Sequence, residues 1–380
     1  MKYIYLFLFF VLLSCSENKN LKDTSLVTYH IDFEKNVPYF WDDYFVYSHR
    51  VVLETNENSL FREISRLIIQ DSRIYILSCS MKKVVVFDMQ GKFLGAVERH
   101  GSGPEEYLNI ADMNVTPEQN IEILDNVQSQ INTYTLDGEW IQSRACQLAS
   151  AFSQVDEDVY IFNRNNFRGS RNNTPVSNFV CVKNDSIIIE DIRIIEPLIG
   201  RTFYYGEGNS LLYPAFQGVS IPHNDTLYTF NKVKMKLERS CFFDFHVRRP
   251  DVEMSERDIR KYIRACDKGE IPSSLYCLYE MDKYIFGIFN YKKEPKHVLI
   301  FKNGDNSLVS SPQINKDKFP ILPIPFTDKQ AEEYYIVSMV TAQYIKRQSN
   351  NSTQTLLHRI SEEVENEDNN PVLLFWKMKN

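Results

Sequence analysis

The stretch IYILSCSMKKVVVFDMQGKF, residues 74–93, recurs as IEILDNVQSQINTYTLDGEW, residues 121–140, at an offset of 47 residues. In each copy, an apolar run is followed by a polar turn and then by a second run rich in β-branched or aromatic residues. Each copy then has a turn that contains Gly91 or Gly138. Glycine adopts the positive φ that a tight hairpin requires. A repeat of this length built from short strands is typical of a β-propeller blade.

Weaker copies of the pattern continue along the chain, and they predict an all-β fold, a six-bladed β-propeller that forms one domain over residues 29–380. We expect Tyr29–Val52 to supply an outer strand that closes the ring beside the C-terminal strands. The third to sixth units are expected around Asp158–Phe162, Asp225–Phe230, Lys283–Phe289, and Tyr334–Val340 with Pro371–Lys377.

The composition permits a folded body and argues against one class of partner. Of the 380 residues, 43% are hydrophobic and 24% are charged, so the chain can bury a core and is not disordered. The formal net charge is −7. Because binding to phosphate needs clustered Lys and Arg, this balance argues against a general nucleic-acid binder.

A short helical insertion is predicted over about residues 253–268. Ser255 can cap the helix, apolar residues from Ile259 onward recur at helical spacing, and Gly269 can end it. The helix either packs on the rim of the propeller or forms a mobile lid over the central channel. A second helix is a candidate over Thr327–Glu333.

The N-terminus predicts the compartment. Tyr3–Leu13 is an unbroken apolar run that is too short to span a bilayer and fits a signal peptide. Leu12–Cys15 resembles the lipobox of bacterial lipoproteins, which implies cleavage before Cys15 and lipidation of that residue. Residues 1–14 are then the signal peptide, and residues 15–28 are the lipidated Cys and a polar tether. The alternative is a plain signal peptide with an incidental Cys.

The lipobox resemblance implies a protein anchored to a membrane of the cell envelope. Ser16 after the lipidated position favours the outer membrane by the sorting rule of some Gram-negative bacteria, with the domain facing the periplasm or the cell surface. The other six Cys residues form no CxxC motif, so the sequence does not indicate a zinc-binding site or a thioredoxin-like redox site. Cys266 and Cys277 flank a short loop, and whether they form a disulfide is left open.

The sequence HGSGPEEY, residues 100–107, carries a family resemblance. It resembles the G-x-G-P-x-[EQ]-[FY] linker of NHL-repeat propellers and the matching motif of a six-bladed β-propeller lipoprotein family of Gram-negative bacteria, related to the TolB-like group. In this sequence the motif residues are Gly101, Gly103, Pro104, Glu106 and Tyr107. We interpret them as a structural connector in which Tyr107 places its ring between blades. Glu105 and Glu106 could bind a cation, but a capped turn is the preferred interpretation.

No catalytic motif is present in the sequence. HExxH, GxSxG, a phosphate-binding loop and an EF-hand loop are all absent, and no metal ligands are predicted. Propellers commonly bind ligands at the mouths of the central channel. By that logic the candidate ligand-binding residues are Tyr204, Tyr205, His223, Asn224 and Asp225.

Two main hypotheses for function follow. The first is a lipid-anchored binding or scaffold module for a protein, peptide or glycan, with no cofactor. The second is a metal-dependent lyase or hydrolase at one mouth of the channel, where a calcium or zinc ion would activate water or substrate. A structural part of a larger envelope assembly is a third possibility.

Overall fold

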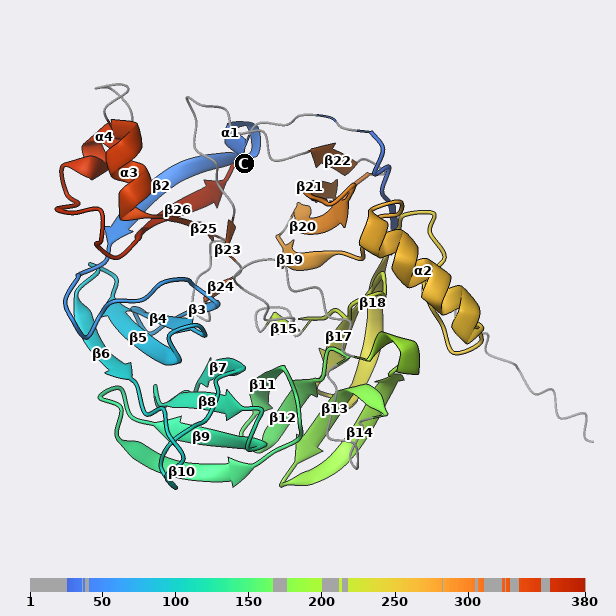
Figure 1. Ribbon diagram of the computed structural model, residues 1–380, viewed down its shortest axis with the longest axis horizontal. Helices are drawn as coiled ribbons and strands as arrows, with labels where there is room; N and C mark the ends of the chain where they lie inside the picture. Colours follow the sequence, from blue (N-terminus) through green and yellow to red (C-terminus); the bar gives the residue numbers. More distant parts are fainter. Residues whose placement is uncertain are drawn as a thin grey trace, which may run out of the picture.

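The computed structural model shows a ring of small β-sheets (Figure 1). The description covers residues 26–35, 37, 41–166, 176–199, 212–213, 218–281, 283–304, 307–310, 323–324, 326–328, 335–349 and 356–379. The described strands form six sheets, which we number in chain order. They are mostly antiparallel, as expected for a propeller-like all-β protein.

The first three sheets follow the chain directly. Sheet 1 has the order β24-β3-β4-β5-β6, with β24 (Phe326–Asp328), β3 (Arg66–Gln70), β4 (Arg73–Ser78), β5 (Lys83–Asp88) and β6 (Phe93–Val97). Sheet 2 contains β7 (Asp112–Val115), β8 (Ile121–Asp125), β9 (Gln130–Tyr134) and β10 (Trp140–Ala145). Sheet 3 contains β11 (Ala151–Asp156), β12 (Val159–Asn163), β13 (Ser177–Lys183) and β14 (Ser186–Arg193).

The last three sheets include strands from the N-terminal region. Sheet 4 has the order β1-β18-β17-β16-β15, with β1 (Val27–His30), β15 (Leu212–Tyr213), β16 (Gly218–Val219), β17 (Thr226–Asn231) and β18 (Lys236–Asp244). Sheet 5 contains β19 (Tyr276–Glu280), β20 (Tyr284–Tyr291), β21 (Glu294–Phe301) and β22 (Ser307–Ser310). Sheet 6 has the order β2-β26-β25-β23, with β2 (Phe45–Val52), β26 (Val372–Met378), β25 (Tyr335–Val340) and β23 (Pro323–Ile324).

The repeat in the sequence corresponds to sheets 1 and 2. The first copy supplies β4 and β5, and the second supplies β8 and β9. Gly91 and Gly138 both adopt positive φ, 85° and 78°, in the turns after β5 and β9. In β4 and β5 the apolar runs are continuous rather than alternating, because both faces of these strands are covered.

Six hydrophobic clusters fill the spaces between neighbouring sheets. One cluster joins sheets 1 and 2 through residues such as Tyr75 and Tyr134, and others join sheets 2 and 3, 3 and 4, and 4 and 5. A further cluster joins sheets 5 and 6 through Phe286 and Trp376. The last joins sheet 6 back to sheet 1 through Leu373 and Leu67. The packing therefore forms an unbroken cycle.

The two ends of the domain meet in sheet 6. β2 pairs antiparallel with β26, in a register that runs from Phe45 opposite Met378 to Val52 opposite Val372. This pairing confirms that the N-terminal segment supplies an outer strand beside the C-terminal strands. β1 differs from that expectation, because it pairs in parallel with β18 of sheet 4. Val27 and Thr28, which were expected in the tether, thus belong to a strand.

The helices lie outside the ring (Figure 1). They are α1 (Trp41–Tyr44), the 3₁₀ helix η1 (Glu196–Leu198), α2 (Glu256–Lys268), α3 (Ala342–Ser349) and α4 (Leu356–Ser361). The predicted insertion is confirmed as α2, whereas the second expected helix is wrong at Thr327 and Asp328, which extend sheet 1 as part of β24 beside β3. None of the described helices is long and apolar enough to cross a membrane.

The GxGPEEY motif forms the connector between sheets 1 and 2. Tyr107 is fully buried between the two sheets, and its hydroxyl donates to the Lys82 carbonyl at 2.7 Å. Glu106 accepts from the Gly103 N–H at 2.7 Å. A Cβ on Gly101 would displace the Glu106 carboxylate from this position. The interpretation as a capped turn with an inserted Tyr is confirmed.

A buried ion pair joins the central ends of three sheets. Arg66 at the start of β3 contacts both carboxylate oxygens of Asp112 on β7 at 2.6 Å, and each side chain is only 3% exposed. Asp112 also accepts from the Phe152 N–H on β11 at 2.9 Å. A single carboxylate therefore fixes three inner strands relative to one another.

We expect Asp112→Ala to lower the free energy of unfolding by about 3–5 kcal/mol, because the Arg66 charge would stay buried without its partner. Urea unfolding followed by circular dichroism measures this loss. The matched control is Glu139→Ala, which breaks the exposed pair with Arg99 and should change stability by less than about 1 kcal/mol. Equal small losses in both variants would contradict the structural role of Asp112.

Candidate functional site

Three of the predicted ligand-binding residues, His223, Asn224 and Asp225, occupy the turn between β16 and β17. Tyr204 and Tyr205 lie outside the described residues. His223 and Asp225 are buried, and Asn224 is half-buried, with its side-chain amide donating to the Tyr228 hydroxyl at 3.1 Å.

His223 and Asp225 belong to a polar network beneath α2. Arg249 Nε donates to Asp225 Oδ2 at 2.6 Å, and Arg249 Nη1 donates to the Tyr262 hydroxyl at 3.2 Å. That hydroxyl also lies 3.1 Å from His223 Nδ1. Arg249 further donates to the Pro272 carbonyl at 2.7 Å. The network ties α2 to the start of β17 and to the loop before β19.

The network holds α2 in position, and its side chains are too buried to form an open binding surface. The Asp225 side chain is 1% exposed and that of Arg249 is 9% exposed, and the Arg249 guanidinium covers the Phe245 ring, 5.3 Å from its centroid. His223 has a φ of 65°, a backbone conformation that non-glycine residues seldom adopt. Its N–H donates to Ser274 Oγ at 2.9 Å, which holds this turn in place. A ligand-binding role for these residues stays a prediction.

The helix above the network has well-defined ends. The Ser255 side chain caps it by accepting from the Asp258 N–H, and Gly269 ends it in the left-handed conformation. Ile259, Tyr262 and Ile263 form its buried face and pack with Leu198 of η1. Because this face is packed, α2 lies on the rim of the ring beside sheet 4 and not over the channel (Figure 1).

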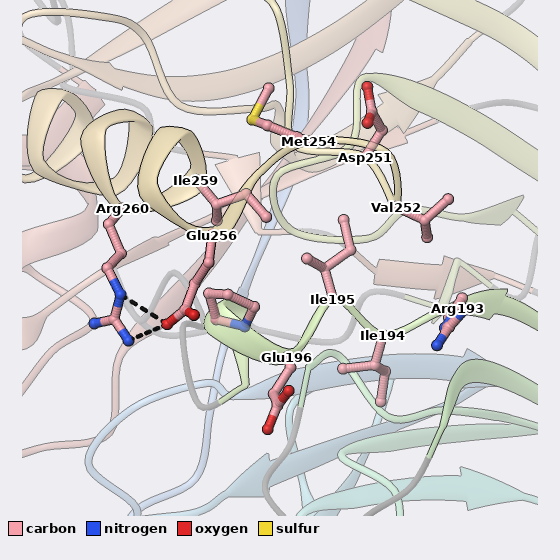
Figure 2. A pocket seen from close by; sticks show the side chains of 11 residues that line it. Arg193, Ile194, Ile195, Glu196, Asp251, Val252, Met254, Glu256, Ile259 and Arg260 are labelled. Atoms are coloured by element: carbon pink, nitrogen blue, oxygen red, sulfur yellow. Dashed lines mark hydrogen bonds and ion pairs between the residues drawn. The ribbon is translucent and has the colours of Figure 1, made fainter.

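A groove of about 460 Å³ opens between α2, the end of β14 with η1, and the loop before α2 (Figure 2). Its apolar lining residues are Ile194, Ile195, Pro197, Val252, Met254 and Ile259. Its charged lining residues are Arg193, Glu196, Asp251, Glu256 and Arg260. Figure 2 shows Ile195, Ile259 and Val252 around the same space, with the Arg260–Glu256 pair at one end and Arg193 at the other. This surface is our candidate binding site.

The described thiols are not suited to nucleophilic chemistry. Burial raises the pKa of Cys79 and Cys181 to about 11, and that of Cys146 and Cys241 to about 12. Thiols in this state stay protonated and react poorly. Cys266 is a free cysteine, and the side chain of Cys277, its possible partner from the sequence, lies outside the described part of the structure.

The sequence analysis missed two features of the molecule. The groove is made by residues 193–197 and 251–260, which carry no recognisable binding motif. The second feature is a group of potential metal ligands, His30, Asp244 and His246, at the outer edge of sheet 4. His30 and Asp244 are 214 residues apart in sequence, so no local spacing could have revealed them.

Asp225 makes the attachment of α2 sensitive to pH. Burial raises its pKa to about 6, although the Arg249 charge opposes the shift. Between about pH 4, the pKa of an unfolded Asp, and pH 6 the folded state therefore binds more protons than the unfolded state. The contribution of Asp225 to the free energy of unfolding is therefore complete below pH 4 and is lost as the pH rises through 6.

We expect the difference in unfolding free energy, wild type minus Asp225→Asn, to fall by about 3 kcal/mol between pH 4 and pH 7, since two pKa units correspond to that energy. Urea unfolding at several pH values measures both proteins. A difference that rises with pH would show that attraction to Arg249 outweighs burial and would contradict the prediction.

Comparison with known proteins places the chain among propeller-like structures. A crystallised Bacteroides fragilis protein that is described as exported has a TM-score of 0.73 at 18% identity, covering 94% of this chain and all of its own. A Bacteroides vulgatus protein of the DUF4221 family has a TM-score of 0.51 at 12% identity, covering 88% of this chain and 98% of its own.

A streptogramin B lyase is a more remote match, with a TM-score of 0.40 at 11% identity over 77% of this chain and 80% of its own. This last likeness carries no argument about activity. Among curated proteins, none matches the sequence significantly.

A family model covers residues 29–377, which is almost the whole of the ring and its helices. Its two boundaries fall in β1 and β26, the strands nearest the two ends of the described domain. The chain therefore belongs to the family described as Domain of unknown function (DUF4934).

Proposed function

We propose that this protein is a lipid-anchored, six-bladed β-propeller of the cell envelope that binds a segment of a partner polypeptide in the groove beside α2. Residues 1–14 are the signal peptide, residue 15 carries the lipid, and the propeller runs to residue 380. The six sheets, packed in a closed cycle, support the blade count. The fold shared with a protein described as exported is consistent with the envelope.

The anchor holds the propeller close to a membrane. Eleven residues separate Cys15 from Val27, where β1 begins. Fully extended, they span at most about 40 Å. The domain therefore works within that distance of the bilayer, at the outer membrane by the sorting rule, where it meets other envelope proteins.

The groove is the observation that carries the binding function. Its volume lies in the range of ordinary ligand sites. Apolar residues line it, and charges of both signs surround them, which suits an apolar side chain flanked by polar or charged neighbours. The three acidic lining residues outnumber the two Arg residues, so a partner segment with a Lys or Arg is favoured.

A peptide fits this surface better than a glycan does. Sugar rings are commonly bound against aromatic side chains, and none of the eleven described lining residues is aromatic. The enzyme alternative places a metal at the mouth of the channel. Among the described residues, the metal-ligand group that is close enough together lies at the outer edge of sheet 4 instead.

Lipid attachment is tested by Cys15→Ser, expressed with the full signal peptide in a Gram-negative host. The wild-type protein should incorporate labelled palmitate and sediment with membranes. The variant should lose the label and appear in the soluble fraction, because it lacks the thiol that accepts the lipid. Cys79→Ser is the control, since Cys79 lies in the folded domain. Equal labelling of the Cys15 variant would contradict the anchor.

Peptide binding is tested with a displayed library of random twelve-residue peptides. The wild-type protein should enrich peptides with an apolar residue next to Lys or Arg. Val252→Asp should weaken their binding at least tenfold, because Val252 lines the groove and is 63% exposed. Val233→Asp is the matched control, since Val233 is 95% exposed in the turn between β17 and β18, outside the groove. Enrichment of no peptide, or equal weakening in both variants, would contradict the proposal.

A further inference from the structure

Three potential metal ligands meet where β1 joins β18. The parallel pairing places His30 directly beside Asp244, and the Ile31 N–H donates to the Asp244 carbonyl at 2.8 Å. His246 follows Asp244 by two residues. One ligand atom from each of the three side chains lies within 4.8 Å of the others.

The carboxylate stands between the two imidazoles. Asp244 Oδ2 is 3.0 Å from His30 Nδ1 and 3.1 Å from His246 Nδ1. Ligand atoms around a tetrahedral zinc ion, with bonds of about 2.0–2.1 Å, are about 3.3 Å apart. Both distances are therefore within a few tenths of an ångström of those in a zinc site.

The surroundings orient these ligands. Asp244 Oδ1 accepts from the His246 N–H at 2.7 Å, which leaves Oδ2 directed at the imidazoles. His246 has a φ of 54°, and the two imidazole rings stack with centroids 5.6 Å apart. A backbone in this conformation costs free energy at a non-glycine residue, and such costs are concentrated at functional sites.

We propose that His30, Asp244 and His246 bind one zinc ion that clamps β1 to β18. Two imidazole nitrogens and one carboxylate oxygen suit zinc better than calcium, which prefers oxygen ligands alone. The His30 and His246 side chains are 55% and 73% exposed, so water can take the fourth position. β1 is the first strand after the tether, and the ion fixes the point where the tether meets the propeller.

The first measurement is calorimetric titration of the chelator-treated protein with zinc. The wild type is expected to bind one equivalent. His30→Gln and His246→Asn should each weaken binding at least tenfold, and asparagine is chosen because it tolerates positive φ. His100→Gln is the control, since His100 is exposed in the connector between sheets 1 and 2 and should bind zinc like the wild type. The thermal midpoint without metal checks that each variant is folded.

Cobalt and hydrogen exchange give independent readouts. Cobalt at the site should show the visible absorption of a tetrahedral ion in the wild type and not in either ligand variant. Zinc should slow amide exchange in β1 of the wild type at least tenfold, and should have no such effect in His246→Asn. Equal zinc affinity in the wild type and both ligand variants would overturn the site. One-equivalent binding without slower exchange in β1 would overturn the clamp.

Discussion

Each sheet in this fold has two apolar faces, and each face is buried against a neighbouring sheet. The last sheet must therefore pack against the first, which closes the ring. The return is made by β2 and β26, which bring residues more than 300 positions apart into one sheet. The cluster that contains Leu67, Val337 and Leu373 then completes the cycle between sheets 6 and 1. Burial of this kind contributes about 25 cal/mol per Å² of apolar surface, and the closing cluster forms only if the two ends pair.

The closed ring determines where elements outside the packed sheets lie. Strands near the centre are buried on both faces and fixed by polar contacts such as that of Arg66 with Asp112. Loops and insertions at the outside do not have to pack between two sheets. The candidate binding groove and the potential metal ligands lie there. α2 is one such insertion, and the network around Arg249 holds it against sheet 4 so that the groove keeps its shape. β1, the N-terminal strand, also lies at the outside, because it pairs with the outer edge of β18.

Much of this architecture could be predicted from the sequence. The repeat predicted sheets 1 and 2, because two copies of a strand pattern at a fixed offset end in turns that need glycine. The caps at Ser255 and Gly269 predicted α2. Contacts between distant segments left no local signal. The pairing of β1 with β18 and the meeting of His30 with His246 are of this kind. His223 was chosen as the residue before a strand, but α2 and Arg249 cover that position. The helices α3 and α4 are short and were not predicted. They are held in position by Ile345 and Ile360, which pack on sheet 6.

We infer that the closing pair of strands holds the ring as one cooperative unit, and native-state hydrogen exchange can measure this cooperativity. The slowest amides of β2 and β26 should open with the same free energy and the same urea dependence as those of β8 in sheet 2, which shares no cluster with sheet 6. That result would mean that separating the ends unfolds the whole molecule. Exchange of β2 through a small local opening, with β8 still protected, would show that the ring is stable without its closure and would contradict the account.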